Sequence, residues 1–236
     1  MQQSNTYTLV FTAIVTIILG ILLSLAATSL KEKQDLNVAI DIKKNILRSL
    51  GFTETKDEPW TQQTIQEIFE KNVEGFVVDS KGNRLSDVSV ENIIDIDQYP
   101  VYCKHIPGYG IDGYSVPISG KGLWSTLYGY IALESDGITV KGITFYKHGE
   151  TPGLGGEVEK EWFTKNFIGK RIINDEGALV SIQIVKGNVD NTSQESFHQV
   201  DGISGATMTG KGVTAFLKTD LRKYETFFRR IRKKDN

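Results

Sequence analysis

The chain has 236 residues, of which 39% are hydrophobic and 24% are charged, and its formal net charge is −2 at pH 7. This length allows one membrane anchor with one or two modest soluble domains, and the charge gives no reason to expect a nucleic-acid partner. The single cysteine, Cys103, excludes an internal disulfide, and the three histidines lack the spacing of metal ligands, so no metal site is expected.

The N-terminus is typical of a membrane anchor. Residues 1–30 carry no charged side chain, and the apolar run 9–30 is long enough to cross a bilayer as one helix. A cleaved signal peptide is the alternative, because residues 24–26 loosely resemble a cleavage site. The uncharged start and the long apolar run favour a retained anchor. By the positive-inside rule, Lys31 and Lys33 would place the following domain in the cytoplasm.

The remaining chain predicts two helices, then a run of strands, then two further helices separated by one strand. Helices are expected at 36–50, 64–71, 155–166 and 207–232, and strands at 73–79, 111–118, 127–133, 138–146 and 179–185, with a further acidic strand within 87–99. Turns are expected at 80–83, 119–122 and 135–137. The fold class is therefore α+β: a single N-terminal transmembrane helix, then a mainly antiparallel sheet and a long C-terminal helix. The predicted divisions are a tail at 1–8, the membrane helix at 9–30, a membrane-proximal α+β region at 31–101 and a second domain at 102–236.

The stretch DGISGATMT, residues 201–209, leads into the last predicted helix. Unpaired N–H groups and a positive dipole at a helix N-terminus suit a phosphate. Gly205 allows close backbone approach, and Ser204, Thr207 and Thr209 offer hydroxyls as caps or as points of attachment. Taken alone, the stretch is better explained as a glycine turn followed by an ordinary Ser/Thr helix cap than as a phosphate site.

Two further stretches could hold a flat ligand. The loop HGETPGLGG, residues 148–156, could bring backbone amides against a ring, with Leu154 on its face and Glu150 or Thr151 at its polar edge. The loop could equally be a plain strand-to-helix connection. In GKGLWSTLYGYIA, residues 120–132, Trp124 and its neighbours could line an aromatic pocket or simply belong to the core.

No catalytic motif is present in the sequence. Ser204 lacks the first glycine of a GxSxG nucleophile elbow, and there is no HExxH. The glycines of GYGIDG, residues 108–113, stand between a proline loop and a strand, which is the wrong context for a dinucleotide site. No residue is therefore assigned a catalytic role.

Together, HGETPGLGG, GKGLWSTLYGYIAL and DGISGATMT resemble the FMN-binding domain family. Its flavin-attachment signature, Asp-x-x-Ser-Gly-Ala-Thr, ends here at Thr207. The resemblance implies that a flavin transferase joins the FMN phosphate to the Thr207 hydroxyl as a phosphoester, with Thr209 as the second choice. The expected cofactor-binding residues are Thr207, Asp201, Ser204, Gly205, Ala206, Met208, Thr209, Glu150, Thr151, Gly153, Leu154, Gly155 and Trp124.

The resemblance also implies a function. It indicates an electron-transfer subunit that carries covalent FMN in a membrane-bound, sodium-pumping NADH:quinone oxidoreductase, with no complete active site on this chain alone. The partners would be the other subunits of that complex. The soluble domain would lie on the periplasmic side of the bacterial inner membrane, which we prefer to the charge count above. The alternatives are the G subunit of an Rnf-type electron-transport complex and a non-redox, membrane-anchored assembly module.

Overall fold

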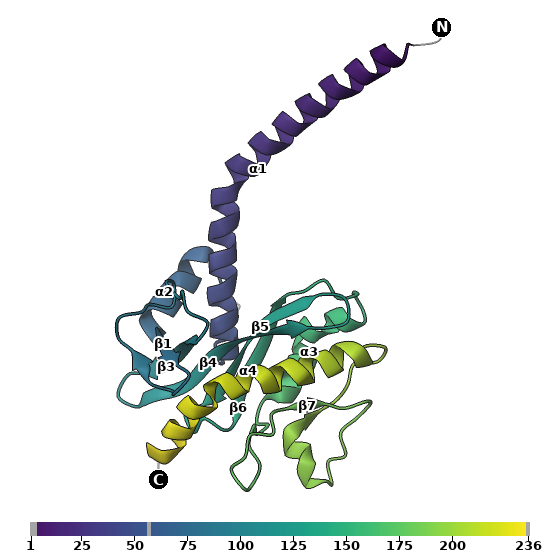
Figure 1. Ribbon diagram of the computed structural model, residues 1–236. Coiled ribbons are helices and arrows are strands. Elements are labelled where there is room, and N and C mark those ends of the chain that lie inside the picture. Colours follow the sequence, from purple (N-terminus) through teal and green to yellow (C-terminus); the bar gives the residue numbers. More distant parts are fainter. Residues whose placement is uncertain (1–3, 56–57, 235–236) are drawn as a thin grey trace. The chain divides into compact units, whose positions relative to one another are not determined.

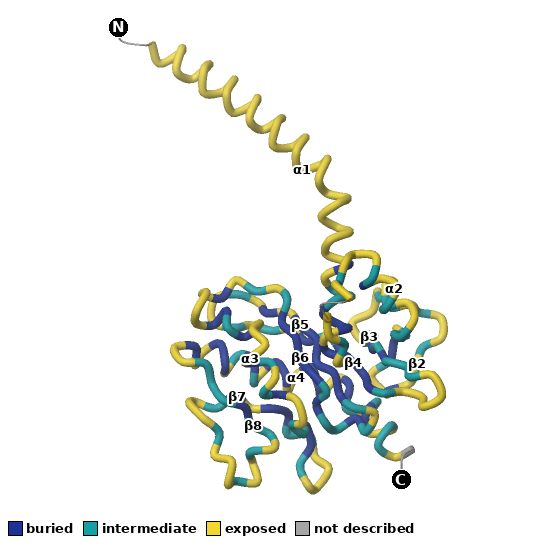
Figure 2. The backbone as a smooth tube through the Cα atoms, turned by 180° about the vertical axis from the view of Figure 1, so that it is seen from behind, coloured by how far each residue is buried: buried dark blue, intermediate teal, exposed yellow. Residues whose placement is uncertain are grey.

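The computed structural model of the chain describes residues 4–55 and 58–234, which divide into two compact units between Asp41 and Ile42. Helix α1 (Asn5–Ser49) forms the first unit and ends within the second. Residues 4–39 are exposed throughout (Figure 2). Among the described helices, α1 alone is long and apolar enough to cross a membrane, so the predicted anchor does form a helix.

The second unit is built on a six-stranded antiparallel sheet with the strand order β2-β1-β3-β4-β5-β6 (Figure 1). All neighbouring strands except β1 and β3 are consecutive in the chain, so the sheet is mostly a meander. The predicted α+β class is confirmed. The elements are α2 (Gln62–Asn72), β1 (Val73–Asp79), β2 (Arg84–Leu85), β3 (Gln98–Ile106), β4 (Gly110–Lys121), β5 (Thr126–Glu134) and β6 (Val140–Lys147).

Helix α4 (Thr207–Lys234) covers one face of this sheet and crosses it over β4 (Figure 1). Its inward positions recur at helical spacing, as the sequence predicts. Glycines let it approach closely, because a Cβ at Gly120 would lie 2.2 Å from the Cβ of Phe216. A Cβ at Gly212 would lie 2.3 Å from the carbonyl oxygen of Lys121. The fully buried residues on this side of α4 are Val213, Leu217, Leu221 and Phe228.

The last turns of α1 cover the opposite face. Ile46 and Leu50 pack with Tyr130 and Ala132, whose side chains alternate with the β5 residues that face α4. Gly51, at φ +83°, follows the end of the helix, close to the predicted end at residue 50. Because both faces are covered, β5 and β6 are buried along most of their length, and the dark stretches of tube in Figure 2 mark these buried residues.

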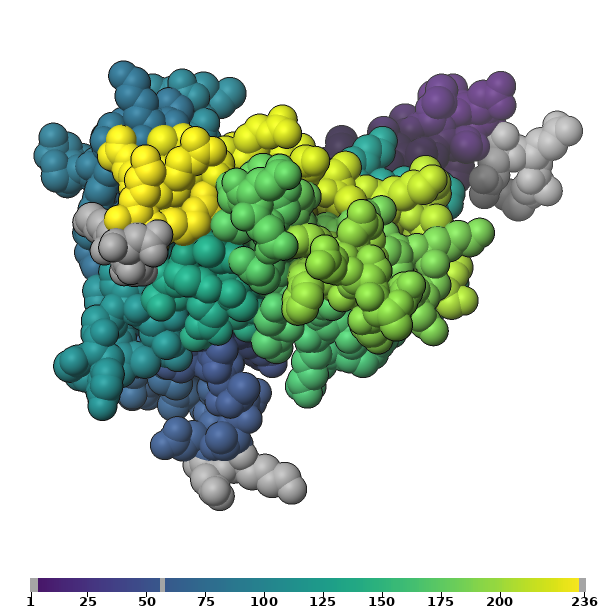
Figure 3. All heavy atoms as spheres, turned by 90° about the horizontal axis from the view of Figure 1, so that it is seen from below, coloured from purple at the N-terminus to yellow at the C-terminus, as the bar shows by residue number. Residues whose placement is uncertain are grey.

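The segment between β6 and α4 differs most from the sequence prediction. It contains η1 (Gly155–Glu159), α3 (Glu161–Thr164), η2 (Lys165–Phe167), β7 (Gln183–Ile184), η3 (Gln194–His198) and β8 (Gln199–Val200), and β7 pairs with β8 in parallel. Figure 3 shows these segments, coloured green to yellow-green, gathered in one mass beside α4. A single helix at 155–166 was wrong, because Lys160 has the extended ψ of 144° and divides it.

Three further predictions need correction. The strand expected at 179–185 is only two residues long, because Ser181 has φ 68° and breaks the extended chain. The turn expected at 119–122 follows later, since β4 continues to Lys121. Of the acidic stretch 87–99, only the last two residues are in a strand, β3. β3 runs across the division at 101–102, so the chain on both sides of it contributes strands to one sheet.

Candidate functional site

The carboxylate of Glu150 joins the three segments that the sequence singles out. It lies in the loop after β6 and is 5% exposed. Its Oε1 accepts hydrogen bonds from the backbone N–H groups of Trp124 (2.9 Å) and Ser125 (3.0 Å), in the turn after β4. Its Oε2 accepts from the hydroxyl of Thr209 (2.7 Å), in the first turn of α4, and from the N–H of Leu123 (3.2 Å). One buried side chain therefore holds two loops and a helix terminus together.

The surroundings of Glu150 keep it ionised. Burial raises the pKa of its carboxyl, but hydrogen bonds from Thr209 and from the N–H groups of 123–125 outweigh burial and lower the pKa below its ordinary value of 4.5. Two glycines leave room for the carboxylate. A Cβ at Gly155 would lie 2.8 Å from Oε2, and a Cβ at Gly122 would lie 2.7 Å from Oε1. Any side chain at either position would displace the carboxylate from its donors.

Thr207 and Thr209 have opposite surroundings. Thr207 is the first residue of α4 and is exposed, whereas Thr209 is 1% exposed and donates its hydroxyl hydrogen to Glu150. The N–H of Gly210 donates to the carbonyl of Ala206 (2.9 Å), so the N–H groups of the three residues before Gly210 have no carbonyl partner within the helix. Ala206 occupies the position before the helix, and its methyl group offers no capping oxygen. Ala206 therefore does not compete with an external anion for these N–H groups.

A groove of about 680 Å³ lies beside Thr207. One wall comes from β7 and the turn after it, and the other from the turn that enters α4. The exposed side chains of Lys186 and Lys211 add positive charge to its lining. The lining residues are Gln183, Ile184, Val185, Lys186, Gly187, Asn188, Gly202, Ile203, Ser204, Gly205, Ala206, Thr207, Gly210 and Lys211.

Large apolar side chains are exposed on the elements that Glu150 holds together. Trp124 is 71% exposed, Leu154 42% and Met208 55%. Leu154 reaches the turn before α4, because a Cβ at Gly205 would lie 2.7 Å from Leu154 Cδ2, and Gly205 itself has φ +74°. The two loops and the helix start thus present apolar surface on segments that the buried carboxylate of Glu150 fixes.

The other predicted site residues lie in the loop after β6 and in the segment that enters α4. Asp201 Oδ1 accepts the N–H of Val189 (2.7 Å), which ties the start of DGISGATMT to the chain beyond β7. The carbonyl of Thr151 accepts two N–H groups from later in its own loop, at 3.1 and 2.9 Å, and Gly153 makes the turn at φ +75°. Ser204 is exposed. All of these positions therefore lie in the loops around the start of α4.

Sequence reasoning did not assign Ser125 and Lys186 to the site. Ser125 supplies a backbone N–H to Glu150, and its Oγ accepts the N–H of Gly149 (2.7 Å), so it joins the two loops directly. The signal for Ser125 lay in its place next to Trp124, in the turn between two predicted strands. Lys186 comes from a segment whose strand was expected to be longer, and no local pattern connects it to the start of α4.

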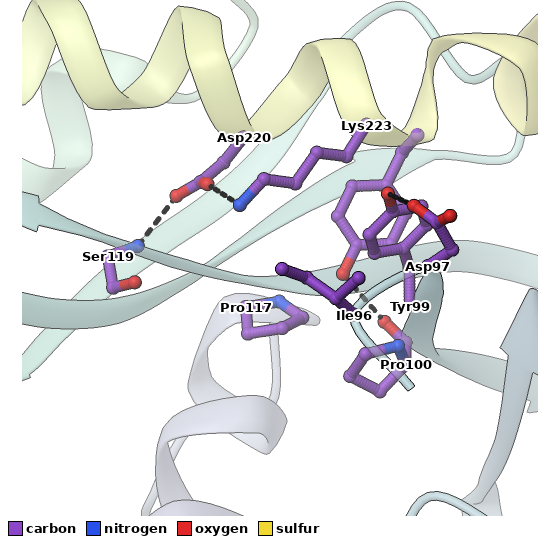
Figure 4. Close-up of a pocket in the computed structure, with 9 residues that line it drawn as sticks. Ile96, Asp97, Tyr99, Pro100, Pro117, Ser119, Asp220 and Lys223 are labelled. Carbon is purple, nitrogen blue, oxygen red and sulfur yellow. Dashed lines mark hydrogen bonds and ion pairs between the residues drawn. The ribbon is translucent and has the colours of Figure 1, made fainter. Parts of the chain in front are cut away.

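A second cavity, of about 470 Å³, lies between α4 and the strands β3 and β4 (Figure 4). Its polar groups are bonded within the chain. Asp220 accepts the N–H of Ser119 (2.7 Å) and pairs with Lys223 (2.6 Å). The hydroxyl of Tyr224 donates to the carbonyl of Pro100 (3.1 Å). These contacts give the cavity a structural role in fixing α4 on the sheet.

Comparisons with known proteins find similar sequences and structures that cover most of the chain. Residues 122–222 match the FMN-binding domain family. The chain is 34% identical to the C subunit of the Na(+)-translocating NADH-quinone reductase of Pseudomonas aeruginosa, over 98% of this chain and 98% of that protein. The crystal structure of the C subunit from Parabacteroides distasonis superposes with a TM-score of 0.72 at 32% identity, over 84% of this chain and 96% of that one. The Shewanella oneidensis NqrC structure gives a TM-score of 0.69 at 27% identity, over 82% of this chain and 97% of that one.

The chain belongs to the NqrC family, the C subunits of Na(+)-translocating NADH-quinone reductases. The region that matches the FMN-binding domain contains Glu150 with all of its hydrogen-bond donors, and it contains Thr207. The coverage of 98% extends the likeness to the N-terminal helix α1. Membership of the NqrC family thus confirms the resemblance drawn from the three sequence motifs.

Proposed function

We propose that this chain is an electron-transfer subunit of a sodium-translocating NADH:quinone reductase and that it carries FMN as a phosphoester on Thr207. Membership of the NqrC family and the match to an FMN-binding domain support the cofactor. When bound, FMN supplies the capacity to accept and release electrons, and the chain's own residues hold and orient it. The observation that carries the proposal is an exposed threonine, beside the groove, at a helix N-terminus where the preceding residue, Ala206, has no capping side chain.

The two candidate threonines differ in burial, and this difference favours Thr207 as the attachment site. A phosphoester requires a hydroxyl that an enzyme can reach, and Thr207 is exposed. The hydroxyl of Thr209 is enclosed and already bonded to Glu150, and attachment there would leave Oε2 without its closest donor. Thr209 therefore serves to hold Glu150 in place, and Thr207 serves as the point of attachment.

The start of α4 suits a phosphate on Thr207. The unpaired N–H groups of the first helical turn and the positive end of the helix dipole favour an anion at this position. Lys186 and Lys211 line the same groove and add positive charge. Because Ala206 cannot cap the helix, no side chain at that position competes with the phosphate for the N–H groups.

We propose that the isoalloxazine ring packs on the apolar surface of Leu154, Trp124 and Met208, next to the attachment point. These side chains are exposed, and a flat aromatic ring would cover part of their area. Glu150, Thr151, Gly153 and Gly155 contribute by holding the loop after β6 in shape. The backbone N–H groups and carbonyls of that loop are then the polar partners for the ring edge.

The same assignment gives the chain a place in the cell. We infer that α1 anchors it as a single-pass protein in the bacterial inner membrane and that the second unit faces the periplasm. Its partners are the other subunits of the complex, with a flavin transferase for maturation. The G subunit of an Rnf-type complex is the alternative, but 34% identity across 98% of the chain to a member of the NqrC family favours the quinone reductase.

Co-expression with a flavin transferase, followed by intact mass and peptide mapping, tests the proposal. We expect an added mass of one FMN minus water on the peptide that contains Thr207, because forming the ester releases water. Thr207→Ala should abolish the adduct. A Thr209→Ser control, which keeps the hydroxyl, should retain it. Flavin that survives denaturation in Thr207→Ala would refute the attachment site, and an unmodified wild-type chain would favour a non-redox assembly module.

A further inference from the structure

Away from the flavin site, Glu74, Cys103 and His105 bring three different metal-ligating atoms together. Within the described residues, their donor atoms lie within 4.8 Å of one another. Glu74 and Cys103 are directly paired across β1 and β3, and His105 follows Cys103 by two residues. Side chains of a strand alternate between faces, so the three share one face of the sheet. The pairing of β3 with β4 shifts register between Lys104 and His105, a bulge of the kind that redirects a side chain.

The three atoms converge on one point. Cys103 Sγ lies 3.2 Å from His105 Nε2, His105 Nε2 lies 2.9 Å from Glu74 Oε2, and the sulfur lies 3.9 Å from the same Oε2. A zinc ion with Zn–S of about 2.3 Å and Zn–N and Zn–O of about 2.0 Å in tetrahedral geometry would separate these pairs by about 3.5, 3.3 and 3.5 Å. Each pair therefore needs to move by only about 0.4 Å to bind one ion.

A nucleophilic Cys-His-Glu triad does not explain the arrangement. In a triad the histidine uses one ring nitrogen for the nucleophile and the other for the carboxylate. Here the same atom, Nε2 of His105, faces both Cys103 and Glu74. A single nitrogen that faces both partners cannot pass a proton from one side of the ring to the other, so the cluster is not a triad.

Arg84 orients the carboxylate for such a role. Its guanidinium pairs with Oε1 of Glu74, while it also stacks over the ring of Phe76 at 4.5 Å from the centroid. Oε1 is thereby occupied, and Oε2 points to the cluster. A partner that fixes one carboxylate oxygen and leaves the other to a metal is a common second layer of metal sites.

We propose that Glu74, Cys103 and His105 form a binding site for a divalent transition-metal ion of the zinc type, with the fourth position open to solvent. Cys103 is fully buried and forms the floor, while the side chains of Glu74 and His105 are 41% and 44% exposed and give access. A soft sulfur, an imidazole nitrogen and a carboxylate suit zinc or cobalt better than magnesium or calcium. On binding, the thiol releases its proton to solvent and the sulfur–metal bond forms.

The site is independent of the flavin. Phe76 lies on β1, the strand that carries Glu74. Phe227, in the C-terminal part of α4, packs on Phe76. Phe227 follows Thr207 by twenty residues along one helix, which corresponds to about 30 Å. Metal binding would tie β1 to β3 without contact to the flavin-carrying threonine.

Metal titration of the tag-free, full-length chain in detergent tests this site. After chelation and reduction, Zn²⁺ titrated by calorimetry should bind at one ion per chain, and Co²⁺ should give thiolate-to-cobalt charge-transfer absorption, read as a difference from the metal-free sample. Cys103→Ser and His105→Asn should each weaken Zn²⁺ binding by at least about 100-fold. His198→Asn, at a histidine outside the cluster, should leave affinity unchanged.

Two variants keep the test informative. If the Cys103→Ser chain does not fold because Cys103 is buried, the Zn²⁺ affinity of His105→Asn, a change at a half-exposed position, still tests the proposal. Equal Zn²⁺ affinity in wild type and His105→Asn, no binding at all, or a Co²⁺ complex without thiolate absorption would overturn the proposal. Thr207→Ala should bind Zn²⁺ like wild type, so the outcome stays separate from that of the flavin assignment.

Discussion

Replacing Glu150 by glutamine tests whether this carboxylate holds the site together. The carboxylate accepts N–H groups through both oxygens, whereas the amide of glutamine carries one acceptor and one donor group. The hydroxyl of Thr209 can rotate to adapt, but in either amide orientation at least one backbone N–H of 123–125 faces an NH₂ group. A partly buried unsatisfied donor and the loss of charge-assisted bonds should lower the free energy of unfolding by about 3 kcal/mol.

The effect of this substitution should depend on pH. The pKa of Glu150 is lower in the folded chain than its ordinary value of 4.5, so its stabilising contribution is fully present above that value. The contribution is lost as pH falls through the folded pKa. The difference in stability between wild type and Glu150→Gln should therefore be constant from pH 7 to about 5 and shrink at lower pH.

Urea unfolding of the full chain in detergent, followed by tryptophan fluorescence, measures this difference. Thermal unfolding should show a fall in midpoint of roughly 10 °C for a unit of this size. Glu161→Gln is the matched control, because Glu161 is exposed and its carboxylate pairs with Lys165 at the surface; its effect should stay within about 0.5 kcal/mol. If Glu150→Gln were as stable as Glu161→Gln at pH 7, the reasoning would be wrong.

Three further substitutions test the same structure. Gly155→Ala should lower the free energy of unfolding by about 1–3 kcal/mol, because the new Cβ would lie 2.6 Å from Thr209 Oγ1. It should also lower flavin incorporation. Denaturant unfolding measures the first effect and the yield of bound flavin measures the second. Gly120→Ala should loosen α4 from β4 at a similar cost, seen as faster amide exchange in α4, since its Cβ would lie 2.2 Å from Phe216 Cβ. Phe228→Ala should cost about 3–5 kcal/mol, because the ring is fully buried; a change below about 1 kcal/mol would contradict its place in the core.

Much of the fold could be predicted where one physical signal dominated. β1 has the predicted bounds, Val73–Asp79, and α4 begins at the predicted Thr207. Hydrophobic periodicity over a long segment determines such elements almost alone. The chain between β6 and α4 lacked such a signal. Its local conformation depends on tertiary hydrogen bonds, such as that from the N–H of Ile184 to the hydroxyl of Thr214 (3.0 Å), thirty residues further along the chain, which no short window contains.

For the candidate site as well, local features could be predicted from the sequence and long-range contacts could not. The glycines and hydroxyls of DGISGATMT indicated a phosphate position because turn chemistry is local. The role of Glu150 was not visible, since its partners Trp124 and Thr209 lie 26 and 59 residues away in sequence. The Glu74 and His105 pair is likewise 31 residues apart, and only the pairing of β1 with β3 brings the two together.

The missing cap of α4 is the feature that best distinguishes the start of this helix from an ordinary one. Thr61 caps α2 with its side chain in a capping box, so the chain uses this device where a helix only needs to begin. At α4 the corresponding position is Ala206, although alanine there costs about 1 kcal/mol relative to serine or threonine. The hydroxyl residues Ser204 and Thr207 stand on either side of it and are both exposed. A helix whose N-cap residue has no side-chain acceptor, and whose first turn Glu150 fixes from within, agrees with the proposal that the start of α4 receives a phosphate.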